Sequence, residues 1–225
     1  VGFNVTLFEA SRTLGGRART VKIHEKQLDN GQHILLGAYQ ATLSQLQKAG
    51  VDTRKAFLRL PLQMRYPAGN DGMDFVAPSL PAPLHLLVAL WKATGLTRED
   101  KMALARFTTS ARWMGWQLND DCSVSTLLER FDQTDRLIKL MWRPLCIAAL
   151  NTPIEQASAQ IFLNVLRDSL GAQRSASDML LPRIDLGALF PEQAAQYVRV
   201  REGRVICGTS VKAIHRESQS WQLVL

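Results

Sequence analysis

The sequence contains few of the residues from which disulfide frameworks and metal sites are built. Its three cysteines, Cys122, Cys146 and Cys207, are widely spaced and never form a C-x-x-C pair, which argues against both a disulfide framework and a zinc site. The four histidines also lack the spacing of metal ligands. We therefore expect no bound metal, and we expect the three thiols to be buried or half-buried.

Long apolar runs and an excess of acidic residues are also missing. Because no run of 18 apolar residues occurs, no membrane-spanning helix is predicted. We expect a cytoplasmic protein, with peripheral contact at the inner face of the membrane as an open alternative. The 27 Lys and Arg residues outnumber the 20 Asp and Glu residues, and the net charge of +7 favours anionic partners such as a pyrophosphate or an acidic membrane surface. The basic residues are spread along the chain without a zinc-finger or helix-turn-helix pattern, so we expect no nucleic-acid partner. The oligomeric state stays open.

The first 20 residues carry the pattern of a dinucleotide-binding βαβ unit. A short apolar run from Val5 to Phe8 ends at Glu9, which is where such a unit places the carboxylate that binds the ribose hydroxyls. Gly15 and Gly16 let the backbone pass close to a ligand, and Arg17 adds a permanent positive charge. The glycine-rich turn that precedes this strand by about 20 residues would fall before Val1. We therefore expect an internal fragment without the first strand and glycine turn, which as written is colourless and inactive.

Residues 9–17 resemble the E-A-x-x-x-x-G-G-R motif of the FAD-dependent amine oxidase and phytoene desaturase superfamily. This resemblance implies FAD as the cofactor. The alternative for the same residues is a strand, a turn and a basic loop without a ligand.

Two further segments are similar to segments of the same superfamily. Residues 28–37 look like the segment that passes beside the flavin, in which Gly31 allows close approach while Gln32 and His33 offer donors. His33 could equally be a structural or half-exposed histidine. The pattern Val205-x5-Val211-x2-Ile214 resembles the strand pair in which the backbone of the residue at Val211 binds adenine, although an ordinary buried strand residue would look the same.

The order of expected elements predicts an α/β protein, a Rossmann-like FAD-binding domain interrupted by a largely helical substrate domain. We expect a partial FAD-binding domain over residues 1–60, an insert over 61–190 and a return to the FAD-binding domain over 191–225. A hairpin is predicted from strands 62–66 and 73–77 with a turn at 69–72. Helices are expected over residues 39–49, 84–94, 97–113, 125–131, 135–149, 154–170 and 191–197, the third with Thr97 as N-cap and Asp100 completing a capping box. Strands are expected over residues 204–207, 210–215 and 221–225.

Several segments of the insert are similar to the hydroxysqualene dehydroxylase family, also described as squalene-associated FAD-dependent desaturases of hopanoid biosynthesis. The segments are residues 80–87, 142–153, 166–170, 178–183 and 185–191. The resemblance implies an enzyme of isoprenoid lipid metabolism that removes the hydroxyl of hydroxysqualene, with hydride from reduced FAD, to give squalene.

Such a reaction needs an acid to protonate the leaving hydroxyl, and three aspartates near the end of the insert are candidates. Each is more readily explained as a helix cap or as an ion-pair partner of a nearby arginine, so the catalytic residue stays unknown. The candidates are Asp168, Asp178 and Asp185, and the arginines are Arg167, Arg174 and Arg183.

The apolar segment 84–91, followed by Lys92, could rest on a membrane or be an ordinary buried helix. Trp113, Trp116 and Trp142 are candidates for a pocket wall or for the core. Two alternatives to the hydroxysqualene enzyme remain. One is another desaturase or amine oxidase of the superfamily, and the other is an inactive fragment that binds isoprenoid or membrane.

Overall fold

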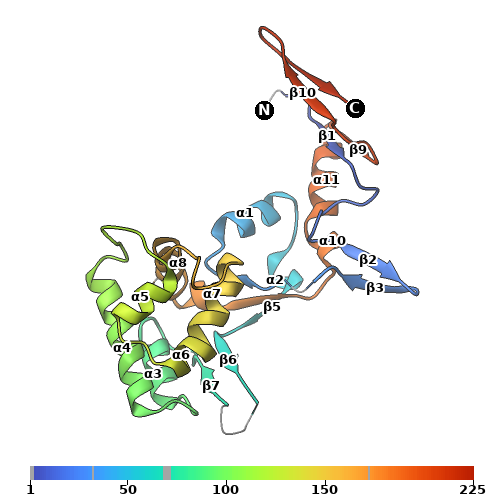
Figure 1. Ribbon diagram of the computed structural model, residues 1–225. Helices are drawn as coiled ribbons and strands as arrows, with labels where there is room; N and C mark the ends of the chain where they lie inside the picture. Colours follow the sequence, from blue (N-terminus) through green and yellow to red (C-terminus); the bar gives the residue numbers. More distant parts are fainter. Residues whose placement is uncertain (1–2, 32, 68–71, 172) are drawn as a thin grey trace. The chain divides into compact units, whose positions relative to one another are not determined.

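The computed structural model describes residues 3–31, 33–67, 72–171 and 173–225. The chain forms two compact units (Figure 1). Unit 1 comprises residues up to 35, 39–59 and 180–225, and unit 2 comprises residues 36–38 and 60–179. Unit 1 resumes at Leu180, earlier than the residue 191 expected from the sequence, because apolar side chains of residues 180–189 are buried in its core. That core consists of Leu46, Ala56, Phe57, Leu180, Leu186 and Leu189.

Unit 1 contains most of the strands. Its short elements agree with the expected α/β character, and β8 lies between β4 and β5 in a three-stranded sheet. The elements are β1 (Thr6–Glu9), β2 (Thr20–Ile23), β3 (Lys26–Asp29), β4 (Leu35–Leu36), α1 (Gln40–Lys48), α2 (Thr53–Ala56), β5 (Phe57–Leu60), β8 (Met179–Pro182), α10 (Leu186–Leu189), α11 (Pro191–Val200), β9 (Arg204–Cys207), β10 (Ala213–Arg216) and β11 (Trp221–Val224).

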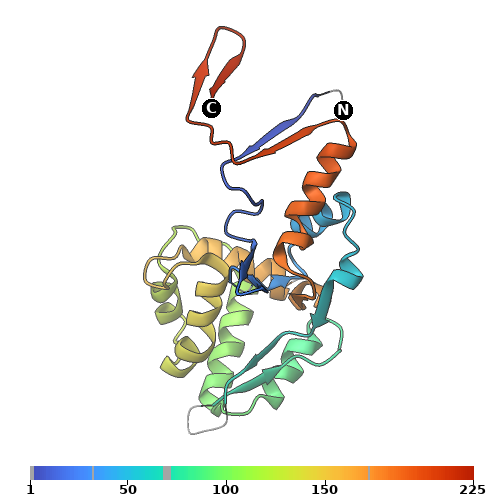
Figure 2. The same ribbon diagram turned by 90° about the vertical axis from the view of Figure 1, so that its right-hand side faces the viewer.

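Strands β1 and β9 run parallel and side by side, with Glu9 opposite Cys207 (Figure 2). The helix α11 leads into β9 and begins with Pro191, whose fixed φ suits the first helical position. It continues to Val200, three residues beyond the expected end. The turn into β9 is made by Glu202 at φ +64° and Gly203. Strand β9 confirms the strand predicted over residues 204–207.

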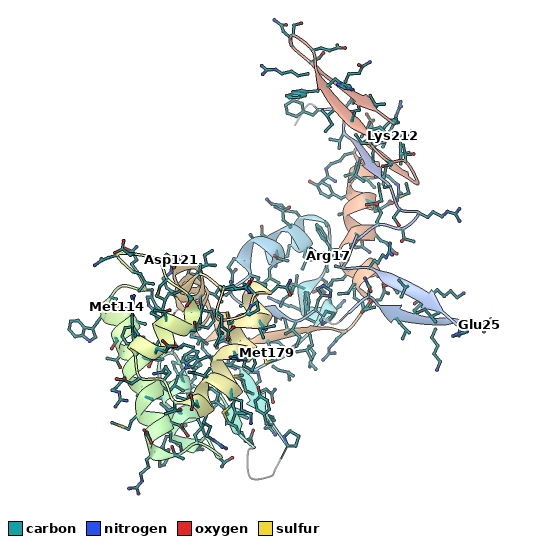
Figure 3. The ribbon with its side chains drawn as sticks, viewed as in Figure 1. Arg17, Glu25, Met114, Asp121, Met179 and Lys212 are labelled. Carbon is teal, nitrogen blue, oxygen red and sulfur yellow. The ribbon has the colours of Figure 1, made fainter. Side chains whose placement is uncertain are left out.

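Strands β2 and β3 form an antiparallel hairpin that the sequence analysis did not predict. Its two-residue turn consists of His24 and Glu25, which both have positive φ values of 46° and 63°. This turn geometry matches the twist of the flanking strands but is usually made with Asn or Gly. Glu25 marks the tip of the hairpin in Figure 3.

Unit 2 is mainly helical. Its elements are β6 (Gln63–Arg65), β7 (Asp74–Val76), α3 (Leu84–Lys92), α4 (Arg98–Trp113), α5 (Val124–Arg130), α6 (Asp135–Leu137), the π-helical segment η1 (Ile138–Trp142), α7 (Arg143–Leu150), α8 (Ala159–Leu166), the π-helical segment η2 (Arg167–Gly171) and α9 (Arg174–Ser177). Strands β6 and β7 pair in antiparallel fashion, which confirms the predicted hairpin strands. Most of the predicted turn, residues 69–71, lies outside the described residues.

The N-terminus of α4 has the capping box predicted from the sequence. The Asp100 N–H donates to the Thr97 hydroxyl at 3.1 Å, and the Asp100 carboxylate accepts from the Thr97 N–H at 2.8 Å. Asp100 is 2% exposed and also accepts from the Thr134 hydroxyl at 2.6 Å. Burial alone would raise the pKa of Asp100, but the hydrogen bonds from Thr134 and Thr97 and the nearby Arg136 outweigh it and lower this pKa.

The helix expected over residues 154–170 begins later, at Ala159. The Ser158 hydroxyl accepts from the Ile161 N–H and so caps α8, while the backbone before it turns after Pro153. Asp121 supports this cap, accepting from the Ser158 hydroxyl at 2.6 Å and the Gln160 N–H at 2.9 Å (Figure 3). These hydrogen bonds lower the pKa of Asp121.

Aromatic side chains form the centre of the unit 2 core. The ring centroid of Phe107 lies 4.7 Å from that of Trp142 and 5.6 Å from that of Phe131. The Trp142 indole N–H donates to the buried Gln133 side chain at 2.9 Å, so burial of this polar atom costs little. Trp142 is therefore a core residue of unit 2.

The cysteines are free thiols with different environments. Cys146 is buried and Cys122 is half-buried, as expected, but Cys207 is exposed because it ends the short strand β9. Burial, followed by the charge of Glu155, raises the pKa of the Cys146 thiol. Within the described residues, no three His, Cys, Asp or Glu side chains come together as a metal site requires. No helix in the described parts of the chain is both long enough and apolar enough to cross a membrane.

Candidate functional site

Glu9 lies at the carboxyl end of β1, where parallel α/β sheets bind their ligands. One carboxylate oxygen, Oε1, accepts from the Ser11 N–H at 2.7 Å. The Thr209 N–H donates to the Glu9 carbonyl at 3.0 Å, which ties the end of β1 to the loop after β9. Among the described residues no donor contacts the other carboxylate oxygen, Oε2. It can therefore accept hydrogen bonds from the hydroxyl groups of a ligand.

The two glycines of the following loop have different surroundings. Gly15 has φ +106°, and a Cβ there would lie 2.6 Å from the Ala18 carbonyl oxygen, so the close packing of its own chain requires glycine. Gly16 has φ +56°, and a Cβ there would meet nothing within 4 Å. The space beside Gly16 is therefore open, which suits close approach of a ligand to the backbone. Arg17, which is labelled in Figure 3, is exposed and can reach an anionic group from this loop.

The structure brings together only some of the predicted cofactor residues. A cavity of about 830 Å³ in unit 1 is lined by Glu9, Gly15, Gly16 and His33, together with largely apolar residues of β1, α1 and α11. Arg17, Gly31 and Val211 do not line it. Gln32 lies outside the described residues.

Gly31 and Val211 are exposed, and their geometry is compatible with ligand contact. Gly31 has φ +92°, and among the described residues a Cβ there would meet only the His33 ring, at 4.0 Å. Val211 lies between β9 and β10 rather than in a strand, so its interpretation as a buried strand residue is wrong. Among the described residues, none forms a hydrogen bond with the backbone N–H or C=O of Val211. Both groups are therefore available to a flat polar ring such as adenine.

Thr20 and Asp29 form a polar network that the sequence analysis missed. The Thr20 hydroxyl donates to Asp185 at 2.7 Å, while the Gly187 N–H donates to the Thr20 oxygen at 3.1 Å. Asp29 accepts from the Leu186 N–H at 2.9 Å. The network fixes the β2–β3 hairpin on the N-terminus of α10. The only member of this network that the sequence analysis singled out is Asp185, which was expected to be a helix cap or an ion-pair partner.

A second cavity, of about 180 Å³, lies within unit 2 and is mostly apolar. Both π-helical segments contribute to its wall, Met141 and Trp142 from η1 and Ser169 from η2, and such segments are frequent at functional sites. No described Asp or Glu lines it. The polar lining residues are Thr108, Thr109, Arg112, Ser169 and Ser177.

Ser177 connects this wall to a buried histidine. Its hydroxyl donates to the Arg174 carbonyl at 2.8 Å, and its oxygen lies 3.3 Å from His85 Nε2. Both Ser177 and His85 are only 1% exposed. Because the single hydroxyl proton is directed to the carbonyl, the serine oxygen accepts from an Nε2–H of His85. Burial first, then the Arg174 guanidinium, lowers the pKa of His85, while the Pro81 carbonyl and Asp178 act in the opposite direction and Arg112 lowers it further.

The three candidate acids are structural groups, which confirms the interpretation as caps and ion-pair partners. Asp168 is exposed and lies 2.8 Å from Arg167, and Asp178 is buried 3.6 Å from Arg174. Asp185 caps α10 rather than pairing with Arg183, and hydrogen bonds from Thr20 and the Ala188 N–H lower its pKa, which disfavours the protonated form that an acid needs. None of the three lines the unit 2 cavity.

The tryptophans divide between the cavity and the surface. Trp116 and Trp142 belong to the buried core of unit 2 and also line its cavity, so both alternatives, the pocket wall and the core, hold for them. Trp113 is 87% exposed, so its placement in a pocket or core is wrong. It is the last residue of α4 and follows the exposed Arg112.

Comparison with known proteins identifies the family. Residues 1–224 match the flavin-containing amine oxidoreductases. The chain is 24% identical to hydroxysqualene dehydroxylase from Zymomonas mobilis over 97% of its own length, and it spans 51% of that protein. Among solved structures it is similar to an oxidoreductase from Methanosarcina mazei (TM-score 0.67, 16% identity, 98% of this chain and 49% of that chain). It is also similar to a putrescine oxidase double mutant (TM-score 0.61, 16% identity, 99% and 49%). The chain therefore belongs to the family of flavin-containing amine oxidoreductases, FAD-dependent oxidoreductases with an α/β fold.

Proposed function

We propose that this protein acts on a C30 isoprenoid and removes the hydroxyl group of hydroxysqualene to give squalene. Its similarity to the hydroxysqualene dehydroxylase of Zymomonas mobilis supports this substrate. The structural observation that carries the proposal is the unit 2 cavity, whose wall is largely hydrocarbon and, in the described chain, has no carboxylate. A carboxylate would be the natural partner of a cationic amine, so the wall favours an uncharged, apolar substrate over an amine.

FAD binding is assigned to the loop after β1 and its neighbours. We propose that Glu9 binds the ribose hydroxyls through its free oxygen. The backbone at Gly15 and at the open Gly16, together with the charge of Arg17, faces the pyrophosphate. Gly31, Gln32 and His33 pass beside the flavin. Val211 offers its backbone to adenine. Reduced FAD, when bound, supplies the hydride for the reaction. The part of unit 2 is to bind the substrate chain and to exclude water, since hydrocarbon walls favour neither water nor ions.

We also propose that α3 makes the peripheral membrane contact. Its only residues that are not apolar are His85 and Lys92, yet it leaves Leu84 52%, Leu87 56% and Trp91 76% exposed. These three side chains repeat at helical spacing and share one face. Leu87 also lines the unit 2 cavity, so a lipid-soluble substrate could pass from a bilayer along this face.

Incubation of the FAD-loaded, reduced protein with hydroxysqualene tests the proposed reaction. Squalene should form, with one water released for each hydroxyl lost, whereas a primary amine supplied to the oxidised protein in air should give no peroxide. Peroxide from the amine without squalene from the alcohol would instead identify an amine oxidase.

A further inference from the structure

The unit 2 cavity has a mostly apolar wall that includes a few polar residues, among them Arg112 and Ser177. Arg112 is exposed overall, but it lines the cavity and lies within electrostatic range of His85. Among the described residues no carboxylate pairs with Arg112. Ser177 lines the same cavity and contacts His85 directly. An arginine that pairs with no described carboxylate and a serine that contacts a buried histidine therefore both line this cavity.

The hydrogen-bonding capacity of this region is specific. Arg112 can only donate. The Ser177 oxygen already donates its proton to a backbone carbonyl and accepts one bond from His85, so it retains capacity for one more incoming donor. An alcohol oxygen can accept a hydrogen bond from Arg112 and donate one to the Ser177 oxygen, so a single hydroxyl group satisfies both residues. A hydrocarbon does neither, and an ammonium group would be repelled by Arg112.

We propose that Arg112 and Ser177, the latter held by His85, form a subsite for the hydroxyl group of an otherwise hydrocarbon ligand. This inference rests on the proposed function and deepens it, because it places the hydroxyl of the substrate in the cavity. The product lacks that hydroxyl and loses both hydrogen bonds. The subsite thereby retains the substrate and favours release of the product.

Two probes of equal chain length test the subsite, the C15 alcohol farnesol and the C15 hydrocarbon farnesene. Binding is followed by quenching of tryptophan fluorescence, since Trp116 and Trp142 line the cavity. Ser177→Ala should weaken farnesol binding about fivefold and Arg112→Met about tenfold or more, because each removes one hydrogen bond and the second is charge-assisted. Neither change should alter farnesene binding.

Matched controls exist on the same elements. Ser169 also lines the cavity, but its hydroxyl donates to the Val165 carbonyl of its own helix at 2.6 Å, so Ser169→Ala should leave both affinities unchanged. Arg106 lies on α4 and does not line the cavity, so Arg106→Met serves in the same way. Thermal unfolding of each variant checks that it is folded.

The outcomes separate this inference from the proposed function. Loss of farnesol affinity alone in Ser177→Ala and Arg112→Met supports the subsite. Equal changes for both probes, or no change for farnesol, overturn it and leave the apolar cavity in place. Failure of both probes to bind the unaltered protein overturns the subsite and removes the observation on which the proposed substrate depends.

Discussion

Replacement of Glu9 by glutamine tests the cofactor site without disturbing the loop around it. In the structure Glu9 uses Oε1 to accept the Ser11 N–H and leaves Oε2 free. The glutamine amide oxygen can keep the bond to Ser11, so the strand end stays capped. The substitution removes the negative charge and one acceptor, which are the properties that a ribose hydroxyl would recognise.

The expected loss follows from the type of bond. A hydrogen bond to a charged group contributes roughly 1.5–3 kcal/mol, which corresponds to about 10- to 150-fold in affinity. Glu9→Gln should therefore weaken FAD binding by at least about tenfold, while Glu9→Ala should weaken it further because the Ser11 N–H also loses its partner. The thermal stability of the protein without FAD should change little for Glu9→Gln.

Titration of FAD into the protein, followed by quenching of flavin fluorescence, measures the effect. Glu25→Gln is the matched control, since it removes the same charge at the exposed tip of the β2–β3 hairpin. Unchanged FAD affinity in Glu9→Gln would refute the assignment of the ribose to Glu9. An equal loss in Glu25→Gln would show that net charge, and not the local contact, controls binding.

Three further predictions test other parts of the molecule. Gly16→Ala should cost about 1–2 kcal/mol of stability, because residue 16 has a left-handed backbone. Gly15→Ala should cost more, because its Cβ would collide with a backbone carbonyl. A similar fall in melting temperature for both variants would contradict this geometry. Asp100→Asn should destabilise the protein by roughly 2–3 kcal/mol near pH 7. Folding lowers the pKa of Asp100, so the stability lost in Asp100→Asn should be constant above the unfolded pKa of about 4 and should shrink as the pH falls below it. Chemical unfolding at several pH values measures this loss, and a loss that does not shrink at low pH would contradict the prediction. Trp91→Glu should reduce cosedimentation with anionic lipid vesicles at least severalfold, whereas Trp221→Glu, which alters another largely exposed tryptophan, in unit 1, should not. Equal binding of both variants would exclude α3 as the contact.

Features with a local cause were predictable from the sequence. The capping box at Thr97 and Asp100 needs only two side chains three residues apart. The hairpin strands β6 and β7 follow from alternating apolar residues around a turn. Strand β9 was predicted with correct bounds for the same reason. In each case the residues that determine the structure lie close together in the sequence.

Features with a distant cause were not predictable. The π-helical segments η1 and η2 interrupt patterns that read as continuous helices, because a π turn changes the hydrogen bonding without a distinct residue signature. Residues 180–190 belong to unit 1 because of contacts with Leu46 and Phe57, far away in the chain. The late start of α8 depends partly on Asp121, which lies 37 residues before the cap that it supports.

The unit 2 cavity shows why a catalytic group could not be chosen from the sequence. The three aspartates suggested by their position turn out to be caps or ion-pair partners away from its wall. Arg112 lies on the wall, but a guanidinium does not give up its proton in proteins. The hydroxyls of Thr108 and Ser169 bond only to carbonyls of their own helices. Ser177 differs from them because it contacts a titratable side chain that comes from a segment 92 residues earlier. Ser177 is therefore the described wall residue through which protonation of His85 can change how a hydroxyl-bearing ligand is held.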